Sequence, residues 1–345
     1  MHPFVYARAE SANAAIASQK PDTEGKNVPS VLARSQYVAG GTTLIDLMKL
    51  DVMRPAFVTD INGLQKDATA GRIEMGPNGL SLGALVRMSE AAENPDVRSN
   101  FPIITQSLAL AASPQIRNMA SLGGNVLQRT RCTYFRDVSY AACNKRAPGS
   151  GCAAMEGINR QHAILGTSNN CIAAYPGDFA QAVIALDAQV QIAGPNGSRS
   201  IPFSELHKAP GDTPHIETTL AQGELITAFV VPKTDWARRS LFLKIRDRES
   251  YEFALASAAV ALELDNGQIK QARIALGGVS TKPWRSREAE EKLNGQAFSD
   301  AAANAAAEAA FAQAKGREHN KFKIELGKRT LMRALHQAVA MEIPS

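Results

Sequence analysis

All four cysteines of this 345-residue chain fall within one 40-residue window, and the rest of the chain has none. They are Cys132, Cys143, Cys152 and Cys171. The stretch around the first three is polar and rich in Gly and Arg, so it buries too little apolar surface to order its own backbone. We therefore expect a sulfur-ligated centre or a pair of crosslinks to hold this stretch in place.

Residue chemistry leaves three interpretations of these cysteines open. Four thiolates suit a [4Fe-4S] cluster or a zinc ion. The closely spaced cysteine pairs of most structural zinc sites are missing, and two disulfides would require an oxidising compartment. Nearby cations should lower the pKa of the thiols and offset the charge of a cluster, and only Asp137 opposes them locally. These cations are Arg129, Arg131, Arg136, Lys145 and Arg146.

Composition excludes several classes of protein. The 38 basic and 33 acidic residues are dispersed and give a net charge of +5, so no nucleic-acid partner is expected. No stretch reaches the roughly 18 apolar residues of a membrane span. The first residues, Met1–Arg8, lack the charged and apolar regions of a secretory signal. A cytoplasmic location is expected, unless a partner that carries a signal exports this chain with it.

Hydrophobic periodicity predicts a mixture of strands and helices, which is the α+β class. Turn residues at 76–79 and 194–197 indicate two hairpins, and a polar turn is predicted at 22–27. A domain boundary is expected after Pro232. Beyond it, three antiparallel strands are predicted at 240–245, 256–264 and 269–276, followed by helices at 299–314 and 322–341. The helices are thus expected to gather late in the chain.

Two glycine loops are suited to holding a phosphate. The first is Ala39, Gly40, Gly41, Thr42, Thr43 and Leu44, and the second is Ser121–Asn125 with Gly123 and Gly124. Backbone without side chains can approach a phosphate and donate N–H groups to it. Neither loop has the G-x-G-x-x-G pattern of a Rossmann fold, and either alone could be a tight turn. Together they favour a pyrophosphate held between two loops.

Six motifs resemble, in order and over nearly the whole chain, the FAD-binding middle subunits of the molybdenum hydroxylases, the xanthine dehydrogenase and carbon monoxide dehydrogenase family. The motifs are Ala39–Thr42, Ile116–Asn125, Pro176–Asp178, Gly223–Ile226, Lys244–Arg248 and Gly277–Arg285. This resemblance implies a two-part FAD-binding domain of the vanillyl-alcohol-oxidase (PCMH) type over residues 1–232. It also implies a second domain of the CO dehydrogenase flavoprotein type over 238–345, with a three-stranded antiparallel sheet and a helix bundle.

Most members of this family lack the cysteine segment, which forms an insertion at about residues 126–172. A similar insertion carrying a [4Fe-4S] cluster occurs in 4-hydroxybenzoyl-CoA reductase and in bacterial periplasmic aldehyde oxidoreductases. The residues around the cysteines are most similar to those of the aldehyde enzymes. The resemblance therefore implies that Cys132, Cys143, Cys152 and Cys171 ligate a [4Fe-4S] cluster.

The resemblance also implies a set of FAD-binding residues. Asp178 is expected near the sugar and adenine end, with a helix N-terminal aspartate as the alternative. Lys244 is expected near the isoalloxazine, where its charge would stabilise a reduced flavin, with a solvated strand lysine as the alternative. Tyr251 could shield one flavin face. The full set is Ala39, Gly40, Gly41, Thr42, Thr43, Leu44, Ala111, Ser113, Ser121, Gly123, Gly124, Asn125, Asp178, Ile226 and Lys244.

By the same resemblance, the chain is expected to be the electron-transfer subunit of a heterotrimeric molybdenum-dependent aldehyde oxidoreductase, with no catalytic side chains of its own. A large subunit would carry the molybdenum cofactor and a small one two [2Fe-2S] clusters. Electrons would reach FAD and then an external acceptor such as oxygen or a quinone. The complex would be periplasmic if a small subunit carries the signal. The alternatives are a 4-hydroxybenzoyl-CoA reductase-like subunit and a non-catalytic zinc- or disulfide-stabilised binding module.

Overall fold

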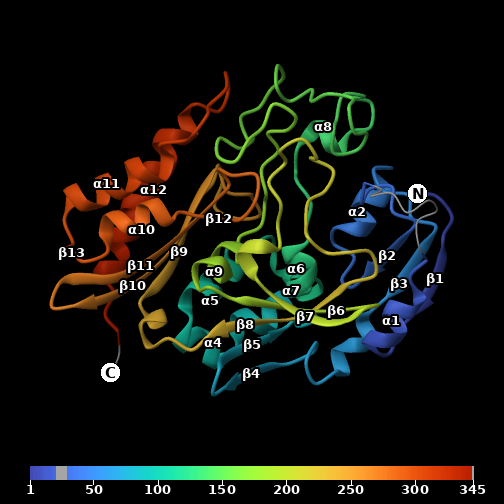
Figure 1. The fold of residues 1–345 in the computed structure, drawn as a ribbon, viewed down its shortest axis with the longest axis horizontal. Helices are drawn as coiled ribbons and strands as arrows, with labels where there is room; N and C mark the ends of the chain where they lie inside the picture. Colours follow the sequence, from blue (N-terminus) through green and yellow to red (C-terminus); the bar gives the residue numbers. More distant parts are fainter. Residues whose placement is uncertain (21–28, 344–345) are drawn as a thin grey trace.

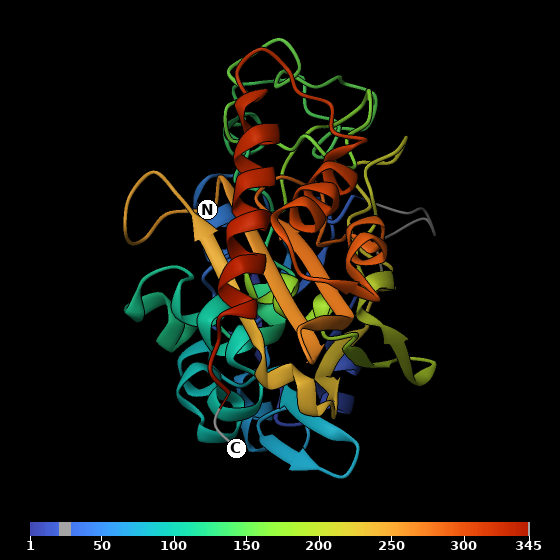
Figure 2. The ribbon, with the colours of Figure 1, turned by 90° about the vertical axis from the view of Figure 1, so that its left-hand side faces the viewer.

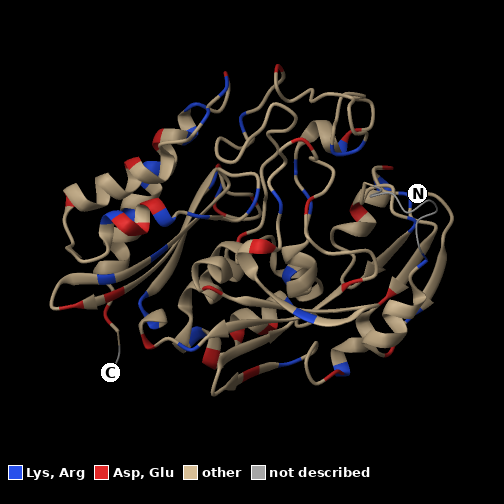
Figure 3. Cartoon of the chain, in the orientation of Figure 1, with Lys and Arg blue, Asp and Glu red and all other residues tan. Residues whose placement is uncertain are grey.

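The structure is a computed structural model that describes residues 1–20 and 29–343. Three sheets organise the chain, and Figure 1 shows them in sequence order from right to left. The turn predicted at 22–27 lies outside the described residues. Basic and acidic residues are interspersed along the described part of the ribbon (Figure 3). Within the described part of the chain, no helix combines the length and the apolar character that crossing a membrane requires.

The first sheet is small and parallel, with strand order β1-β3-β2. Its strands are β1 (Val5–Arg8), β2 (Ser35–Val38) and β3 (Phe57–Asp60), flanked by the helices α1 (Ala12–Ser18) and α2 (Leu44–Lys49) and the 3-10 turn η1 (Asn62–Lys66). Ser11 caps α1 by accepting a hydrogen bond from the N–H of Ala14. The strand β2 leads directly into the first glycine loop and then into α2, so this sheet positions that loop.

The second sheet is antiparallel, with strand order β4-β5-β8-β6-β7. Its strands are β4 (Ile73–Gly76), β5 (Gly79–Gly83), β6 (Gln189–Gly194), β7 (Gly197–Pro202) and β8 (Leu225–Pro232), with the 3-10 turn η2 (Phe203–Glu205) after β7. The pairs β4–β5 and β6–β7 are the two predicted hairpins, which are confirmed.

Short helices follow β5, the second strand of the first hairpin, so the prediction that helices gather late in the chain is wrong. Residues 88–126 hold five of them: α3 (Met88–Glu93), α4 (Pro95–Asn100), α5 (Pro102–Ala109), α6 (Pro114–Met119) and α7 (Leu122–Val126). Proline opens α4, α5 and α6, and the side chains of Asn94 and Ser113 cap α4 and α6. These starts divide one apolar stretch into pieces too short to give a clear helical period.

The third sheet consists of three long antiparallel strands, as predicted, and gains two strands of two residues each. The long strands are β9 (Ser240–Ile245), β10 (Ala256–Asp265) and β11 (Gln268–Gly277), and the short ones are β12 (Trp284–Arg285) and β13 (Gln296–Ala297), with η3 (Asp235–Arg238) before β9. The helices α10 (Arg287–Leu293), α11 (Asp300–Phe311) and α12 (Phe322–Val339) cover one face of this sheet (Figure 2).

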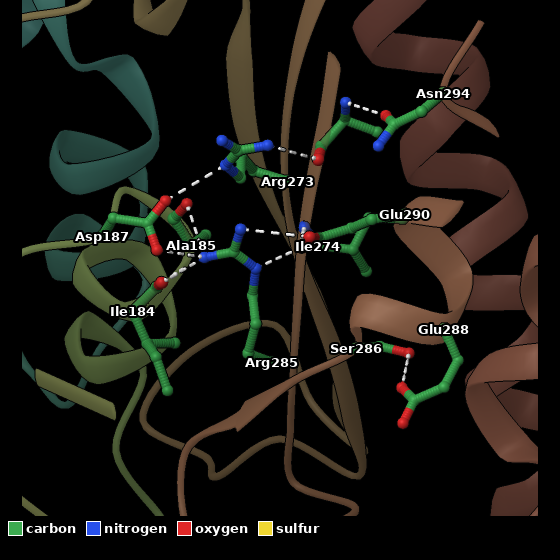
Figure 4. A network of polar contacts seen from close by, with 11 residues as sticks. Ile184, Ala185, Asp187, Arg273, Ile274, Arg285, Ser286, Glu288, Glu290 and Asn294 are labelled. Atoms are coloured by element: carbon green, nitrogen blue, oxygen red, sulfur yellow. Dashed lines mark hydrogen bonds and ion pairs between the residues drawn. The ribbon is translucent and has the colours of Figure 1, made fainter. Parts of the chain in front are cut away.

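A network of charged side chains, buried at Arg285 and Glu290, ties the end of α9 (Phe179–Ala185) to the third sheet (Figure 4). Arg285 of β12 pairs with Glu290 of α10 and, at 2.9 Å, with Oδ1 of Asp187, which follows α9. Nε of Arg273 lies 3.1 Å from Oδ2 of the same Asp187. The end of α9 is therefore held against the third sheet by two arginines.

The cysteine segment contains one short helix, α8 (Thr133–Arg136), and is ordered by hydrogen bonds from polar side chains to backbone. The guanidinium of Arg146 donates to the carbonyls of Tyr134, Phe135 and Tyr140. Ile164, further along, is buried in the core of the third sheet and donates its N–H to Val279 O at 2.8 Å. The expectation that a cofactor or crosslinks must provide all the order of this segment is therefore too strong.

Candidate cofactor sites

The two glycine loops line a single cavity of about 220 Å³. The walls include most of the residues predicted for the FAD pyrophosphate, and Ile226 of β8 lies on the same wall. The predicted residues that line it are Ala39, Gly40, Gly41, Thr42, Thr43, Leu44, Ser121, Gly123, Gly124 and Ile226. We call this space the nucleotide cavity.

Glycine is required where the two loops touch. A Cβ added to Gly40 would overlap the carbonyl group of Met119, which stands just before the second loop. Gly41 has a φ of 71°, in the left-handed region that side chains disfavour. Asn62 helps to fix the first loop because its Nδ2 donates to Ala39 O at 3.0 Å. The closeness of the loops thus depends on the absence of a side chain at position 40.

The loops differ in the hydrogen bonds that they have left to offer. In the second loop, Gly123 N–H donates to Ala84 O at 2.8 Å, and Gly124 N–H donates to Oγ of Ser121 at 3.2 Å. In the first loop, no acceptor within the described residues receives the N–H groups of Gly40, Gly41, Thr42 and Thr43. The first loop is therefore the one that can donate several backbone hydrogen bonds to an anion.

A larger cavity of about 570 Å³ adjoins the nucleotide cavity and shares part of its wall. Tyr37, Leu127 and Arg129 line both spaces, and the sequence analysis assigned none of them to FAD. The hydroxyl of Tyr37 donates to Gly223 O at 3.0 Å, which joins β2 to the turn before β8. Because Tyr37 lies two residues before the first glycine loop, the sequence alone could have indicated that Tyr37 lines this cavity.

Four predicted FAD residues lie together elsewhere, near the end of α5. Lys244 Nζ lies 2.7 Å from Oδ2 of Asp178 and donates to Leu110 O at 3.1 Å, next to Ala111. Ser113 caps α6 close by in the chain, with its Oγ accepting the N–H of Ile116. The sequence analysis placed Asp178 and Lys244 at opposite ends of the flavin. Because the two side chains form an ion pair, the two assignments cannot both be right.

Burial also corrects the alternatives for this pair. The side chain of Lys244 is 1% exposed, so it is not a solvated strand lysine. Asp178 is the N-cap residue of α9, as the helix N-terminal alternative expected, but its side chain makes no capping hydrogen bond and pairs with Lys244 instead. Burial raises the pKa of the Asp178 carboxyl, against the opposing charges of Lys244 and Arg246.

Two further predicted residues lie apart from these groups. Asn125 does not line the nucleotide cavity, and its Nδ2 points to Sδ of Met88 at 3.4 Å. Tyr251 is 54% exposed, with a φ of 52°, in the loop between β9 and β10. Its ring packs against Arg248, with 5.6 Å between the guanidinium carbon and the ring centroid.

All four cysteines lie within the described residues and are free thiols. The backbone segments at Cys143 and Cys152 form an isolated antiparallel β-bridge, which is a contact of the main chain and not a disulfide. A hydrogen bond from Cys171 lowers the pKa of the Cys152 thiol to about 7, whereas burial raises the pKa of Cys132 to about 12. The prediction that neighbouring cations lower the thiol pKa is therefore wrong for Cys132.

The cations of this segment are paired with carboxylates that the local sequence does not contain. Arg131 and Arg136 contact Asp46 of α2, at 3.3 Å and 2.8 Å. In the same way, Arg129 and Lys145 share the carboxylate of Glu217, at 2.5 Å and 2.7 Å.

These pairings lie deep enough to change the titration of the carboxylates. Arg129 and Lys145 overcome the effect of burial and lower the pKa of Glu217 to about 2. The two carboxylates, which lie far from the cysteines in sequence, thus neutralise much of the positive charge that the sequence analysis expected to act on the thiols.

Within residues 1–20 and 29–343, no group of three or more His, Cys, Asp or Glu side chains is arranged to hold a metal ion. The donor set itself is four thiols from one segment with no carboxylate among them, which suits a zinc ion or an iron–sulfur cluster.

Comparison with known proteins indicates the class of protein that the sequence motifs resemble. Residues 8–234 match the family described as FAD binding domain in molybdopterin dehydrogenase, and residues 242–338 match the CO dehydrogenase flavoprotein C-terminal domain. The chain is 43% identical to the aldehyde oxidoreductase FAD-binding subunit PaoB of Escherichia coli over 99% of both chains. It is 28% identical to the glyceraldehyde dehydrogenase medium chain of Sulfolobus acidocaldarius, over 87% of this chain and 85% of that one.

The fold also matches solved structures of this class. A chain of carbon monoxide dehydrogenase from Hydrogenophaga pseudoflava superposes with a TM-score of 0.72 at 23% identity, covering 98% of both chains. The two family matches and the relative at 43% identity define a flavin-binding oxidoreductase subunit. The chain belongs to the FAD-binding medium subunits of the molybdenum hydroxylase family.

Proposed function

We propose that the chain is the FAD- and [4Fe-4S]-binding electron-transfer subunit of a molybdenum-dependent aldehyde oxidoreductase. The observation that carries the FAD site is the single cavity lined by both glycine loops, with unpaired N–H groups along the first loop. The name of the relative at 43% identity supports aldehydes as the substrate class of the whole enzyme. We retain residues 1–232 and 238–345 as the two domains and 126–172 as the insertion.

In this proposal, the chain's own residues bind and orient FAD. The N–H groups of Gly40 to Thr43 donate to the diphosphate, and Gly123 and Gly124 let the opposite wall approach it. Ile226 contributes an apolar wall. FAD, when bound, accepts electrons from the partner clusters and passes them to an external acceptor, and the protein controls access to it.

The buried Asp178–Lys244 pair provides a local charge beside Leu110 and Ala111. We assign this pair, with Ser113, to one end of the same FAD molecule rather than to its two ends. An ion pair buried beside the cofactor would hold the local electrostatic field constant during turnover, because neither partner can reorient toward solvent. Asn125 contacts Met88 outside the nucleotide cavity, so we assign it no direct contact with FAD.

The four thiols are proposed as ligands of a [4Fe-4S] cluster with a mainly structural role. Support comes from a donor set of four thiols in one segment without carboxylates. A structural role also agrees with the polar character of most of residues 126–160, where a cluster would add to the order supplied by Arg146 and by the packing of Phe135. The partners are a large molybdenum subunit and a small [2Fe-2S] subunit, and the compartment is the periplasm if a partner carries the signal.

The proposal is tested on the purified native complex. Iron, acid-labile sulfide and FAD are quantified per copy of this chain, and turnover is assayed with aromatic aldehydes and with aryl-CoA thioesters. We expect one FAD and four irons from this chain, beyond the iron of the small subunit, and activity with aldehydes. Turnover of aryl-CoA would favour the reductase alternative. Zinc in place of iron, without flavin, would favour a non-catalytic binding module.

A further inference from the structure

An imidazole lies against one of the four cysteine sulfurs. Nε2 of His162 is 3.1 Å from Sγ of Cys132, 30 residues earlier in the chain. His162 is 5% exposed, and its ring packs near that of Tyr134, with 6.1 Å between the centroids. Nothing in the spacing of the sequence relates His162 to Cys132.

Cluster chemistry determines the tautomer of this imidazole. A cysteine that ligates iron is a thiolate, which can only accept hydrogen bonds. Nε2 must then carry the proton, and Nδ1 is left with a lone pair. Nδ1 has no hydrogen-bond partner among the described residues and is shielded from solvent. A buried N–H without a hydrogen-bond partner is rarer than a buried acceptor without one. The surroundings of both ring nitrogens therefore favour the tautomer with its proton on Nε2.

The third sheet and α12 hold His162 in place. The carbonyl of His162 accepts hydrogen bonds from Lys323 Nζ at 3.0 Å and from Asn320 Nδ2 at 3.4 Å. Its N–H donates to Asn159 O at 3.0 Å. Lys323 is itself fully buried and also donates to Gly278 O, next to β11. The ring is therefore positioned by residues outside the cysteine segment, and it does not depend on the cluster to bring it to Cys132.

We propose that His162 is a positioning residue that donates a hydrogen bond from Nε2 to the Cys132 thiolate and thereby raises the reduction potential of the cluster. The inference rests on the proposed [4Fe-4S] cluster. Adding an electron to the cluster places more negative charge on its sulfurs, so an N–H donor stabilises the reduced form more than the oxidised form. By comparison, Sγ of Cys171 accepts a longer hydrogen bond, from the backbone N–H of Ala173 at 3.5 Å.

The experiment is a redox titration of the native complex, followed by the EPR signal of the reduced cluster. It compares the wild type with His162→Leu, which removes the donor, and His162→Gln, which keeps an N–H. His207→Leu is the matched control, because His207 is equally buried but bonds to Val126 O at 3.1 Å rather than to a sulfur. Loss of the donor should change the reduced-to-oxidised ratio at a fixed potential roughly tenfold, which is about 59 mV for a one-electron couple.

We expect a lower potential for His162→Leu, a value near the wild type for His162→Gln, and no change for His207→Leu. An unchanged potential in His162→Leu with full iron content would overturn the inference and leave the proposed function intact. Loss of the cluster from both His162 variants but not from the His207 variant would also overturn it, because an N–H alone would then not replace the ring. A wild type without any cluster signal would instead overturn the proposed function.

Discussion

The ammonium of Lys244 lies 2.7 Å from the carboxylate of Asp178, and neither side chain has more than 4% of its surface exposed. The pair joins β9 of the third sheet to the start of α9, which packs against β10 and β11 of the same sheet. Lys244 also donates to Leu110 O at 3.1 Å, at the end of α5. A single buried ion pair therefore connects three elements around one part of the proposed FAD site.

Replacing Lys244 with Met should destabilise the protein by about 3 to 5 kcal/mol, because it leaves the Asp178 carboxylate buried without its partner. The double variant Lys244→Met with Asp178→Asn should recover part of this loss. Urea unfolding of the isolated full chain measures both. A double variant as unstable as the sum of its singles would show that the pair is not coupled.

Gly40→Ala should weaken FAD binding at least tenfold, because the new methyl group collides with the Met119 carbonyl and forces the glycine loops apart. Gly76→Ala is the control, since a Cβ there meets nothing closer than 3.9 Å, at Gly79 O. Flavin content after gel filtration and fluorescence titration with FAD provide the measurement. Equal FAD affinity in both variants would contradict the assignment of the nucleotide cavity.

Arg285→Ala should cost about 3 to 5 kcal/mol of unfolding free energy, because it leaves Glu290 buried without its charge partner and releases the end of α9 (Figure 4). Arg329→Ala is the matched surface control. The side chains of Arg329 and its partner Glu325 are 76% and 61% exposed, so the expected loss of unfolding free energy is below about 1 kcal/mol. Chemical denaturation at constant pH compares the two variants, and similar losses in both would refute the structural role of Arg285.

Stability should rise with pH between about 7 and 10 through Lys323. Burial, with a smaller effect from Arg160, lowers the pKa of Lys323 to about 7 from an ordinary 10.5. In that window the unfolded chain holds this proton and the folded chain does not. Because the unfolded state binds one more proton than the folded state, each rise in pH disfavours the unfolded state and the stability of the folded state increases.

The test compares unfolding free energies at pH 7 and pH 9.5 for the wild type and Lys323→Met. The wild type should gain on the order of 2 kcal/mol relative to the variant over this range. Lys315→Met, in the loop before α12, is the control for a general loss of positive charge. Parallel pH profiles for the wild type and Lys323→Met would contradict the prediction.

Local patterns predicted several elements correctly, and each success has a local cause. The two hairpins are marked by Gly-Pro-Asn-Gly turns, and β10 and β11 are joined at Asn266–Gly267, both with positive φ. The glycines at positions 40 and 41 likewise indicate a place where two segments of backbone lie close together. The helices α4, α6 and α7 were missed because their boundaries depend on single capping residues and prolines rather than on a long apolar period.

The partners of charged residues could not be predicted in the same way. Asp46 meets Arg131 and Arg136 across more than 80 residues of chain, and Glu217 meets Lys145 from the other direction. Local charge counting therefore overestimated the positive field at the thiols and missed the burial that raises the pKa of Cys132. The ion pair of Asp178 with Lys244 was missed for the same reason.

Residue order along this chain was enough to establish its family, its glycine loops and its group of cysteines, because those properties depend on backbone conformation and side-chain chemistry over a few neighbouring positions. Which side chains face one another was set by the packing of three sheets. Contacts such as His162 with Cys132 and Lys244 with Asp178 join segments whose separation in sequence carries no periodic signal, and burial then determines how strongly their charges interact.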